Sequence, residues 1–216
     1  AAEAAERRKN SCVAREWRLA LPIELPLDQR IELATEFADA LIGRYRVVVD
    51  VAIHAPHRSG DERNWHAHLM ATTREIGPDG FGAKTRVLDV AQTGSAEIVA
   101  MRACWADVQN SAFQAAGIEA TVDHRSLEDQ AETALARGDE ALADALNRPP
   151  EPRMGVAATN IERKARNAAL AVGDDYEPVT DRGRDLEAVR AARRELEEAR
   201  LAAAHEYKTS LNHLRR

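Results

Sequence analysis

Histidines gather in one short part of this sequence: four of the seven lie between positions 54 and 68. His66 and His68 are two residues apart in an apolar stretch, so on a β-strand their side chains point to the same face. His54 follows an earlier apolar run and converges on this pair if the two strands are neighbours. Neutral imidazoles on rigid strands bind divalent metals and leave coordination positions open for substrate. The spacing predicts a metal site of three histidines, whereas His57 belongs to a loop and is predicted to be exposed.

Strand-like segments carry these histidines. The apolar run at residues 47–53 and the segment at 65–73 both favour β-structure, and a polar loop containing Pro, Gly and Asp separates them. Further upstream, residues 13–21 predict another strand, which ends before Pro22.

A helix is predicted between the first strand and the histidine strands. Leu27 to Tyr45 carries apolar residues at helical spacing. Pro26 and Asp28 favour a helix start, and Gly43 favours its end.

Downstream of the histidines the sequence predicts turns, helices and short extended pieces. They are a turn-rich loop at 77–82, an extended piece at 84–89, a helix from an N-cap at Ser95 to Ala116 that ends at Gly117, a short strand at 118–123, and helical patterns at 127–146 and 157–172 separated by a break at 148–152.

The order of these elements predicts an α+β fold with an antiparallel core sheet, flanking helices and a C-terminal helical extension. We expect the core at residues 1–125 and a helical extension at 126–183. Residues 184–216 consist mainly of Leu, Ala, Glu and Arg, which predicts a solvated helical or coiled-coil-like arm.

Composition limits the functional classes. The net charge of −6 argues against indiscriminate nucleic-acid binding, so a DNA ligand would depend on local geometry and metal. Cys12 and Cys104 lack the spacing of a disulfide framework or a thiolate metal site. Because neither a membrane span nor a signal peptide is recognisable, we expect a cytoplasmic protein without membrane insertion. The first residues resemble the end of a helix and lack an initiator methionine, which suggests a fragment.

The residues alone leave three functions open. A three-histidine site suits metal-assisted phosphoryl transfer, and it also suits a metal-dependent hydrolase or oxygenase that activates a bound water. A noncatalytic DNA-binding or helical interaction module with a structural metal is the third reading. A closed shell of four ligands would favour that module.

A longer pattern around the histidines distinguishes these readings. The stretch His54-Ala-Pro, Gly60-Asp-Glu-Arg-Asn-Trp-His-Ala-His-Leu-Met-Ala-Thr-Thr-Arg74 resembles the MobA/MobL relaxases (MobQ type) of mobilisable plasmids, which are HUH-type DNA-nicking enzymes. The likeness extends over roughly residues 1–165 in consistent order, through Arg8–Ser11, Ala14–Glu16, Ala20–Pro22, Trp105, Val122–Ser126 and Pro152–Gly155.

The resemblance implies metal-dependent nicking of one strand of transfer-origin DNA during conjugation. It assigns His54, His66 and His68 as ligands of a divalent cation, Mg or Mn with Zn as an alternative. In that family a tyrosine hydroxyl attacks the scissile phosphate and forms a 5′-phosphotyrosyl enzyme. The implied partners are single-stranded transfer-origin DNA, accessory mobilisation proteins and a type IV secretion coupling protein. The implied location is the bacterial cytoplasm, from which the protein is transferred with the DNA.

Further residues match the family by position. Glu16 would accept the nucleophile's proton or orient a ligand histidine, although it also suits an ordinary surface position. The family often has a second acid two residues on, where this sequence has Arg18. DNA-contact positions correspond to Asn64, Arg74, Lys84 and Arg86, the last two equally suited to simple surface charge.

Two features remain open after this comparison. Asp123-His124-Arg125 matches a family motif and suits either a hydrogen-bonded turn or a DNA contact. The family's catalytic tyrosine precedes the segment with which this chain opens, and Tyr45, Tyr176 and Tyr207 do not match it. We therefore expect the metal-binding half of a relaxase site, inactive alone, with its nucleophile outside this chain.

Overall fold

The structure is a computed structural model that describes residues 2–6, 8–58, 61–148 and 150–214, without the side chains of residues 204 and 207–214. The chain divides into two compact units, Ala1–Leu146 and Asn147–Arg216. The first contains a 3-10 helix, η1 (Glu3–Ala5), and then β1 (Ala14–Ala20), α1 (Leu27–Tyr45), β2 (Val49–His54), β3 (His66–Thr72), β4 (Arg74–Gly77), β5 (Gly80–Lys84), α2 (Ala91–Ala115), α3 (Leu127–Ala136) and α4 (Glu140–Leu146).

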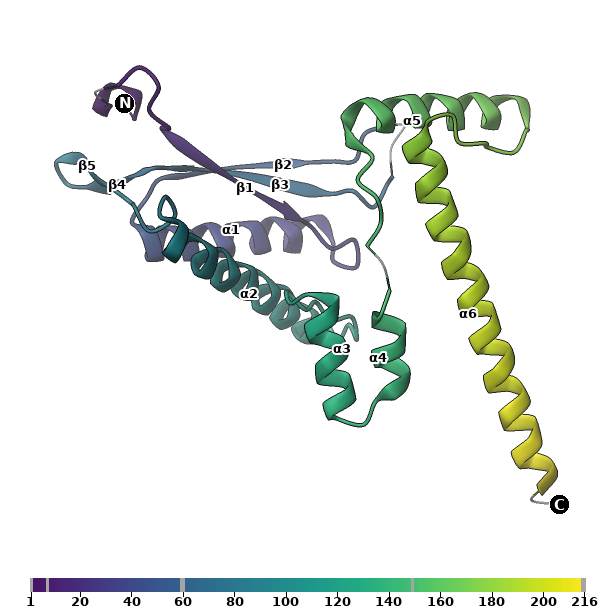
Figure 1. The fold of residues 1–216 in the computed structure, drawn as a ribbon. Coiled ribbons are helices and arrows are strands. Elements are labelled where there is room, and N and C mark those ends of the chain that lie inside the picture. The colour runs from purple at the N-terminus through teal and green to yellow at the C-terminus, as the bar shows by residue number, and fades with distance from the viewer. Residues whose placement is uncertain (1, 7, 59–60, 149, 215–216) are drawn as a thin grey trace. The chain divides into compact units, whose positions relative to one another are not determined.

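A three-stranded antiparallel sheet in the order β1-β3-β2 forms the centre of the first unit. Helices α1 and α2 lie side by side on one face of this sheet (Figure 1). The predicted α+β class, with its antiparallel core sheet, is therefore confirmed. The order places β3, which carries two of the histidines, between the other two strands.

Alternation along β3 separates the core from the open face. Ala67, Leu69 and Ala71 are buried, and they pack with Phe37 and Leu41 of α1 in the main apolar cluster. The intervening side chains of β3 point to the other face, because successive side chains of a strand alternate between the two faces of the sheet. Burial of the apolar set thus fixes which face presents the histidines, because a register slip by one residue would bury them.

Helix α1 has the predicted bounds, but Gly43 does not end it. The helix continues through this glycine to Tyr45, and the chain reverses at Arg46, which adopts a left-handed conformation with φ 54°. The Arg46 amide donates to the Ile42 carbonyl and closes the last turn. Helix α2 also anchors this end of α1, because Glu97 of α2 accepts hydrogen bonds from Arg44 and from the Tyr45 hydroxyl.

Four local predictions between residues 77 and 123 are wrong. The loop at 77–82 is the turn and second strand of a β4–β5 hairpin, with Gly80 at φ 101°. The extended piece at 84–89 is not continuous, because Lys84 ends β5 and residues 87–90 form turns and a bend. Helix α2 begins at Ala91, four residues before the predicted N-cap Ser95. Residues 118–123 form no strand, since the Asn110 side chain binds the Val122 backbone and supplies the hydrogen bonds that a strand partner would give.

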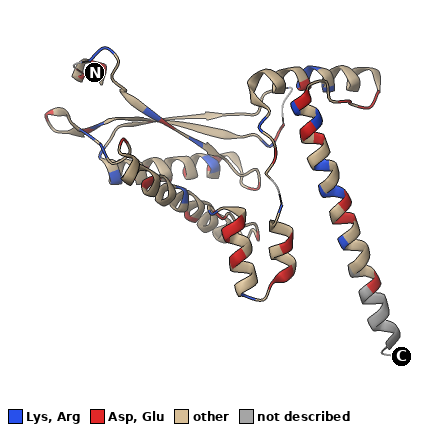
Figure 2. Ribbon diagram, in the orientation of Figure 1, with Lys and Arg blue, Asp and Glu red and all other residues tan. Residues whose placement is uncertain are grey.

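The predicted helical segment at 127–146 is two helices. Ser126 caps α3 by accepting a hydrogen bond from the Asp129 amide, and Gly138, with φ 79°, lies in the turn before α4. Figure 2 shows that acidic residues prevail on α3 and α4.

The second unit contains α5 (Gly155–Val172) and α6 (Asp181–Leu214), so the predicted helix at 157–172 and the predicted helical arm are both confirmed as helical. Glu162 of α5 is buried and accepts hydrogen bonds from the Tyr176 hydroxyl and from the Val179 and Thr180 amides. These contacts fix the turn between the helices. Among the described residues, no helix combines the length and apolarity needed to cross a membrane.

Candidate metal centre

The three predicted histidines converge at one end of the sheet. His54 and His66 are direct partners in the β2–β3 register, and His68 is two residues further along β3. Ring centroids of His54 and His68 lie 4.6 Å apart, and each lies 5.2 Å from the His66 ring. One nitrogen from each ring can be chosen so that all three lie within 4.8 Å of one another. The arrangement follows from strand alternation and from the antiparallel register that brings His54 opposite His66.

Hydrogen bonds orient two of the three rings. Nδ1 of His66 lies 2.9 Å from the Asn64 carbonyl oxygen, and Nδ1 of His68 lies 2.5 Å from a carboxylate oxygen of Glu16. Both acceptors require that Nδ1 carry the proton, which leaves the Nε2 lone pair of each ring free for a metal. A carboxylate behind a ligand histidine also raises the basicity of that ligand.

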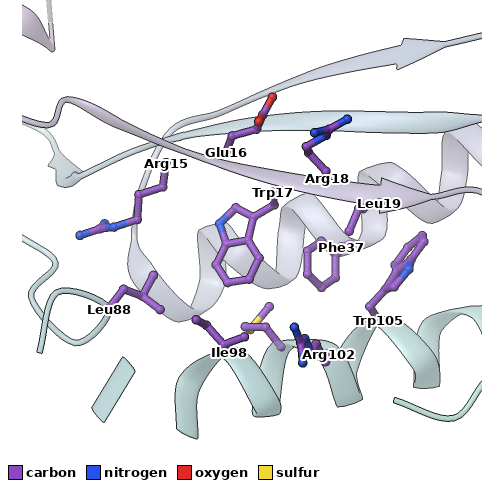
Figure 3. Close-up of a pocket in the computed structure, with 11 residues that line it drawn as sticks. Arg15, Glu16, Trp17, Arg18, Leu19, Phe37, Leu88, Ile98, Arg102 and Trp105 are labelled. Atoms are coloured by element: carbon purple, nitrogen blue, oxygen red, sulfur yellow. The ribbon is translucent and has the colours of Figure 1, made fainter. Parts of the chain in front are cut away.

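Glu16 reaches His68 across the sheet from β1. It alternates with Trp17, so its side chain lies on the histidine face while Trp17 extends into an apolar cavity of about 390 Å³ on the helix side (Figure 3). The hydrogen bond from His68 lowers the pKa of the Glu16 carboxyl, and the nearby charge of Arg18 acts in the same direction. Glu16 is therefore placed to orient a ligand histidine as a carboxylate.

The residues fit a divalent cation. In a tetrahedral site with metal–nitrogen bonds of roughly 2.1 Å, two nitrogens lie about 3.4 Å apart, so nitrogens that already lie within 4.8 Å of one another need to approach only modestly to share one ion. Two of the histidines are only partly exposed and His54 is exposed, so the site is open to solvent on one side. Three nitrogen donors leave room for oxygen ligands from water or a phosphate.

Comparison with known proteins identifies the chain. The model of the MobA/MobL family matches residues 1–164. The chain belongs to the MobA/MobL family. It is 32% identical to "Mobilization protein MobL" of Acidithiobacillus ferridurans, over 75% of this chain and 46% of the relative. It is 36% identical to "Mobilization protein A" of Escherichia coli, over 57% of this chain and 19% of the relative. The chain thus spans less than half the length of these relatives.

A solved structure described as "Molecular Basis of Vancomycin Resistance Transfer in Staphylococcus aureus" is also similar. It shares 32% sequence identity with this MobA/MobL chain, with a TM-score of 0.48, and the match covers 58% of this chain and 63% of that one.

A buried arginine supports the histidine end of the sheet and was not predicted from the sequence. Arg30 of α1 donates to the carbonyls of Pro22 and Ile23, and its guanidinium lies 4.8 Å from the Trp65 ring centroid. The Trp65 carbonyl in turn accepts from the Leu21 amide, immediately before His66. The sequence pattern does indicate that Arg30 is buried. Arg30 precedes Ala34, Phe37 and Leu41 at helical spacing and hence shares their buried face.

The residues that match DNA-contact positions in the family have different environments. The backbone of Asn64 orients His66. Arg74 and Lys84 both form ion pairs with Glu6, whose side chain is buried. Arg86 is exposed, with its guanidinium 3.8 Å from Asp89. Their roles toward DNA stay predictions; Arg74 and Lys84 share the single negative charge of Glu6, so the cluster keeps one net positive charge.

The motif Asp123-His124-Arg125 forms a local turn. Asp123 accepts from the Arg125 amide and pairs with the Arg125 guanidinium, which also donates to Thr133 of α3. These bonds place Ser126 at the start of α3. A hydrogen-bonded turn, one of the two readings of this motif, accounts for all of these contacts.

Neither tyrosine with a described side chain lies in the histidine centre. Tyr45 is buried in the core cluster on the helix side of the sheet, and burial together with Glu97 raises its pKa to about 12. Tyr176 donates to Glu162 in the second unit, and burial and that carboxylate raise its pKa. The side chain of Tyr207 lies outside the described part of the chain.

Proposed function

We propose that this chain supplies the metal-binding part of a relaxase that nicks one strand of transfer-origin DNA. The observation that carries the proposal is the convergence of His54, His66 and His68, two of them oriented through Nδ1, on the open face of a sheet in a MobA/MobL chain. His54, His66 and His68 would hold a divalent cation of the Mg or Mn type. Bound there, the cation supplies a Lewis acid that polarises a phosphodiester and offsets charge in the transition state.

The remaining groups of the site serve orientation. Glu16 keeps the proton of His68 on Nδ1, and the Asn64 carbonyl does the same for His66. Both Nε2 atoms can therefore bind a metal through their lone pairs without first losing a proton. A single strand would approach from the solvent side of the sheet, because α1 and α2 cover the other face.

We propose a tyrosine outside residues 1–216 as the nucleophile. In the nicking step its phenolic oxygen forms a bond to the scissile phosphorus, the bond between phosphorus and O3′ breaks, and the phenolic proton ends on the departing 3′ oxygen by way of a general base. Glu16 would accept that proton only while it remains unprotonated beside His68. Tyr45 is unsuitable because it is buried on the opposite face of the sheet and bound to Glu97.

The charge distribution supports a confined DNA path. Acidic residues of α3 and α4 would repel a phosphate backbone, whereas Arg86, the exposed Arg18 of β1 and the exposed arginines of the histidine loop would attract it (Figure 2). Contacts from Arg74 or Lys84 would require exchange of Glu6 for a phosphate. Among these predicted DNA contacts, the uncharged Asn64 forms no ion pair, and Arg86 is only weakly paired, with its guanidinium 3.8 Å from Asp89.

A gel assay with a labelled transfer-origin strand tests this function. We expect no covalent adduct from residues 1–216 with Mn²⁺, and a Mn²⁺-dependent adduct from a longer form that includes the preceding segment of the natural protein. His66→Ala in the longer form should abolish the adduct, whereas the matched loop variant His57→Ala should retain it. An adduct from residues 1–216 that is lost in one of the Tyr→Phe variants would show that the nucleophile lies within this chain.

A further inference from the structure

Arg18 occupies the histidine face beside His68. The two residues are direct partners in the antiparallel β1–β3 register. Figure 3 shows the Arg18 side chain on the same side of β1 as Glu16, away from the cavity that Trp17 enters. Side chains directly opposite each other in antiparallel strands have Cβ atoms roughly 4.5–5.5 Å apart, so the Arg18 side chain starts from a position next to His68 and is long enough to reach a ligand bound at the histidines.

The Arg18 guanidinium is available for a ligand. Its side chain is exposed, and within the described ranges it forms no hydrogen bond or ion pair. Its positive charge lowers the pKa of the nearby Glu16 carboxyl. Two other arginines of this unit are engaged: Arg15 pairs with Asp89, and Arg44 pairs with Glu97. Arg18 thus differs from its neighbour Arg15 in both its face and its lack of a partner.

Charge balance gives this position a chemical meaning. Three neutral imidazoles with Glu16 carry one negative charge, and Arg18 offsets it. A carboxylate at this position would make the same set doubly negative. A second carboxylate favours the cation, whereas a guanidinium favours the anion that the cation must bind. Its planar fork of donors matches two phosphate oxygens.

We propose that Arg18 is a phosphate-binding residue of this site and holds the phosphodiester of single-stranded DNA beside the histidine centre. This inference rests on the proposed function, because it assumes that the centre acts on a phosphodiester. One non-bridging oxygen would face the histidines while the guanidinium binds the other. Arg18 then contributes to affinity for DNA and to the position of the phosphate.

Binding of a fluorescein-labelled ten-nucleotide oligothymidylate, followed by anisotropy in Mn²⁺, tests this role. We expect Arg18→Gln to weaken binding about 5- to 10-fold and to reduce the slope of log K against log salt by about 0.7, the value for loss of one contact to a single strand. Arg18→Lys should restore the slope but only part of the affinity, because it keeps the charge without the fork. The control is Arg102→Gln, which removes the same charge from an exposed position on α2, on the other side of the sheet.

Metal affinity separates this proposal from the one on which it rests. Electron paramagnetic resonance of free Mn²⁺ should show equal or tighter metal binding in Arg18→Gln and clearly tighter binding in Arg18→Glu. If Arg18→Gln and Arg102→Gln give the same DNA affinity and slope while the wild type binds DNA in a Mn²⁺-dependent way, Arg18 has no phosphate role. If the wild type binds no Mn²⁺ and its DNA affinity ignores the metal, the proposed function itself is overturned, and the role of Arg18 with it.

Discussion

The two faces of the three-stranded sheet share every backbone atom and yet have opposite characters. On the helix side, Leu69 and its apolar neighbours are buried against α1. On the open side, the same strand presents His66, His68 and the exposed Met70. Because alternate residues serve alternate faces, one strand can anchor the core and position ligands. Stability and metal binding should therefore respond to different substitutions that are only one residue apart.

Substitution on the covered face should have the largest effect. Leu69→Ala removes a side chain that is fully buried in the core cluster, and we expect it to lower the free energy of unfolding by about 2–5 kcal/mol. Urea denaturation followed by circular dichroism measures this loss. Below the transition, Mn²⁺ affinity should stay within a few-fold of wild type. A folded Leu69→Ala protein without Mn²⁺ affinity would show that the faces are coupled.

Removal of a ligand on the open face should reverse this pattern. His66→Ala should weaken Mn²⁺ binding more than about 100-fold, since even the partners of ligand histidines contribute 10- to 100-fold. Helical content and the urea midpoint of the metal-free protein should change little, because the His66 ring takes no part in the apolar cluster. Isothermal titration with wild type, His66→Ala and the loop control His57→Ala decides the matter. Equal affinities for all three would refute the three-histidine site.

Loss of the carboxylate behind His68 should have a smaller effect. We expect Glu16→Ala to weaken Mn²⁺ binding about 10-fold, because the ring loses the acceptor that fixes its tautomer. Glu16→Gln keeps an acceptor oxygen without the charge, so its Mn²⁺ affinity should lie between that of the wild type and that of Glu16→Ala. Nuclear magnetic resonance of the imidazole nitrogens of His68 would report the tautomer directly. A His68 ring with its proton unchanged on Nδ1 in Glu16→Ala would argue against the orienting role.

The sequence was most informative where local periodicity and tertiary structure agree. Alternation placed His66 and His68 on one face, and helical spacing gave the bounds of α1, because both patterns reflect burial against a single core. The contact between Glu16 and His68 depends on strand order, which periodicity does not determine. The sequence offered Glu16 as a candidate, and the position of β1 next to β3 supplied its partner.

The elements that were mispredicted depend on contacts distant in sequence or on weak patterns. The β4–β5 hairpin has short, glycine-containing strands without a clear apolar alternation. Its turn-forming residues therefore led to the prediction of a loop. The segment at 118–123 has apolar residues typical of a strand, but Asn110 binds its backbone from α2. A side chain that supplies hydrogen bonds to a distant segment leaves no periodic trace in that segment.

The smallest effect is expected at the end of the sheet away from the histidines, where charge holds the N-terminal segment. Glu6 binds Arg74, which follows β3, and Lys84 of β5; these partners, the Arg74 hydrogen bond foremost, lower the pKa of Glu6 from 4.5 to about 2. A carboxyl whose pKa is lower in the folded state than in the unfolded chain stabilises the fold. Its full contribution is present at any pH above the pKa that it has in the unfolded chain. That contribution is lost as the pH falls from about 4.5 to about 2.

Glu6→Gln should therefore lower the urea midpoint modestly at pH 6 and make the midpoint less sensitive to acid between pH 4.5 and pH 2.5. Glu3→Gln, at an exposed position in the 3-10 helix that directly precedes Glu6, is the matched control and should follow the wild-type profile. Mn²⁺ affinity at neutral pH should be the same in all three proteins, because the histidines lie at the other end of the paired strands. A parallel acid profile for wild type and Glu6→Gln would mean that this ion cluster is as strong in the unfolded chain as in the fold. A change in Mn²⁺ affinity would mean instead that the ends of the open face are coupled through the strands.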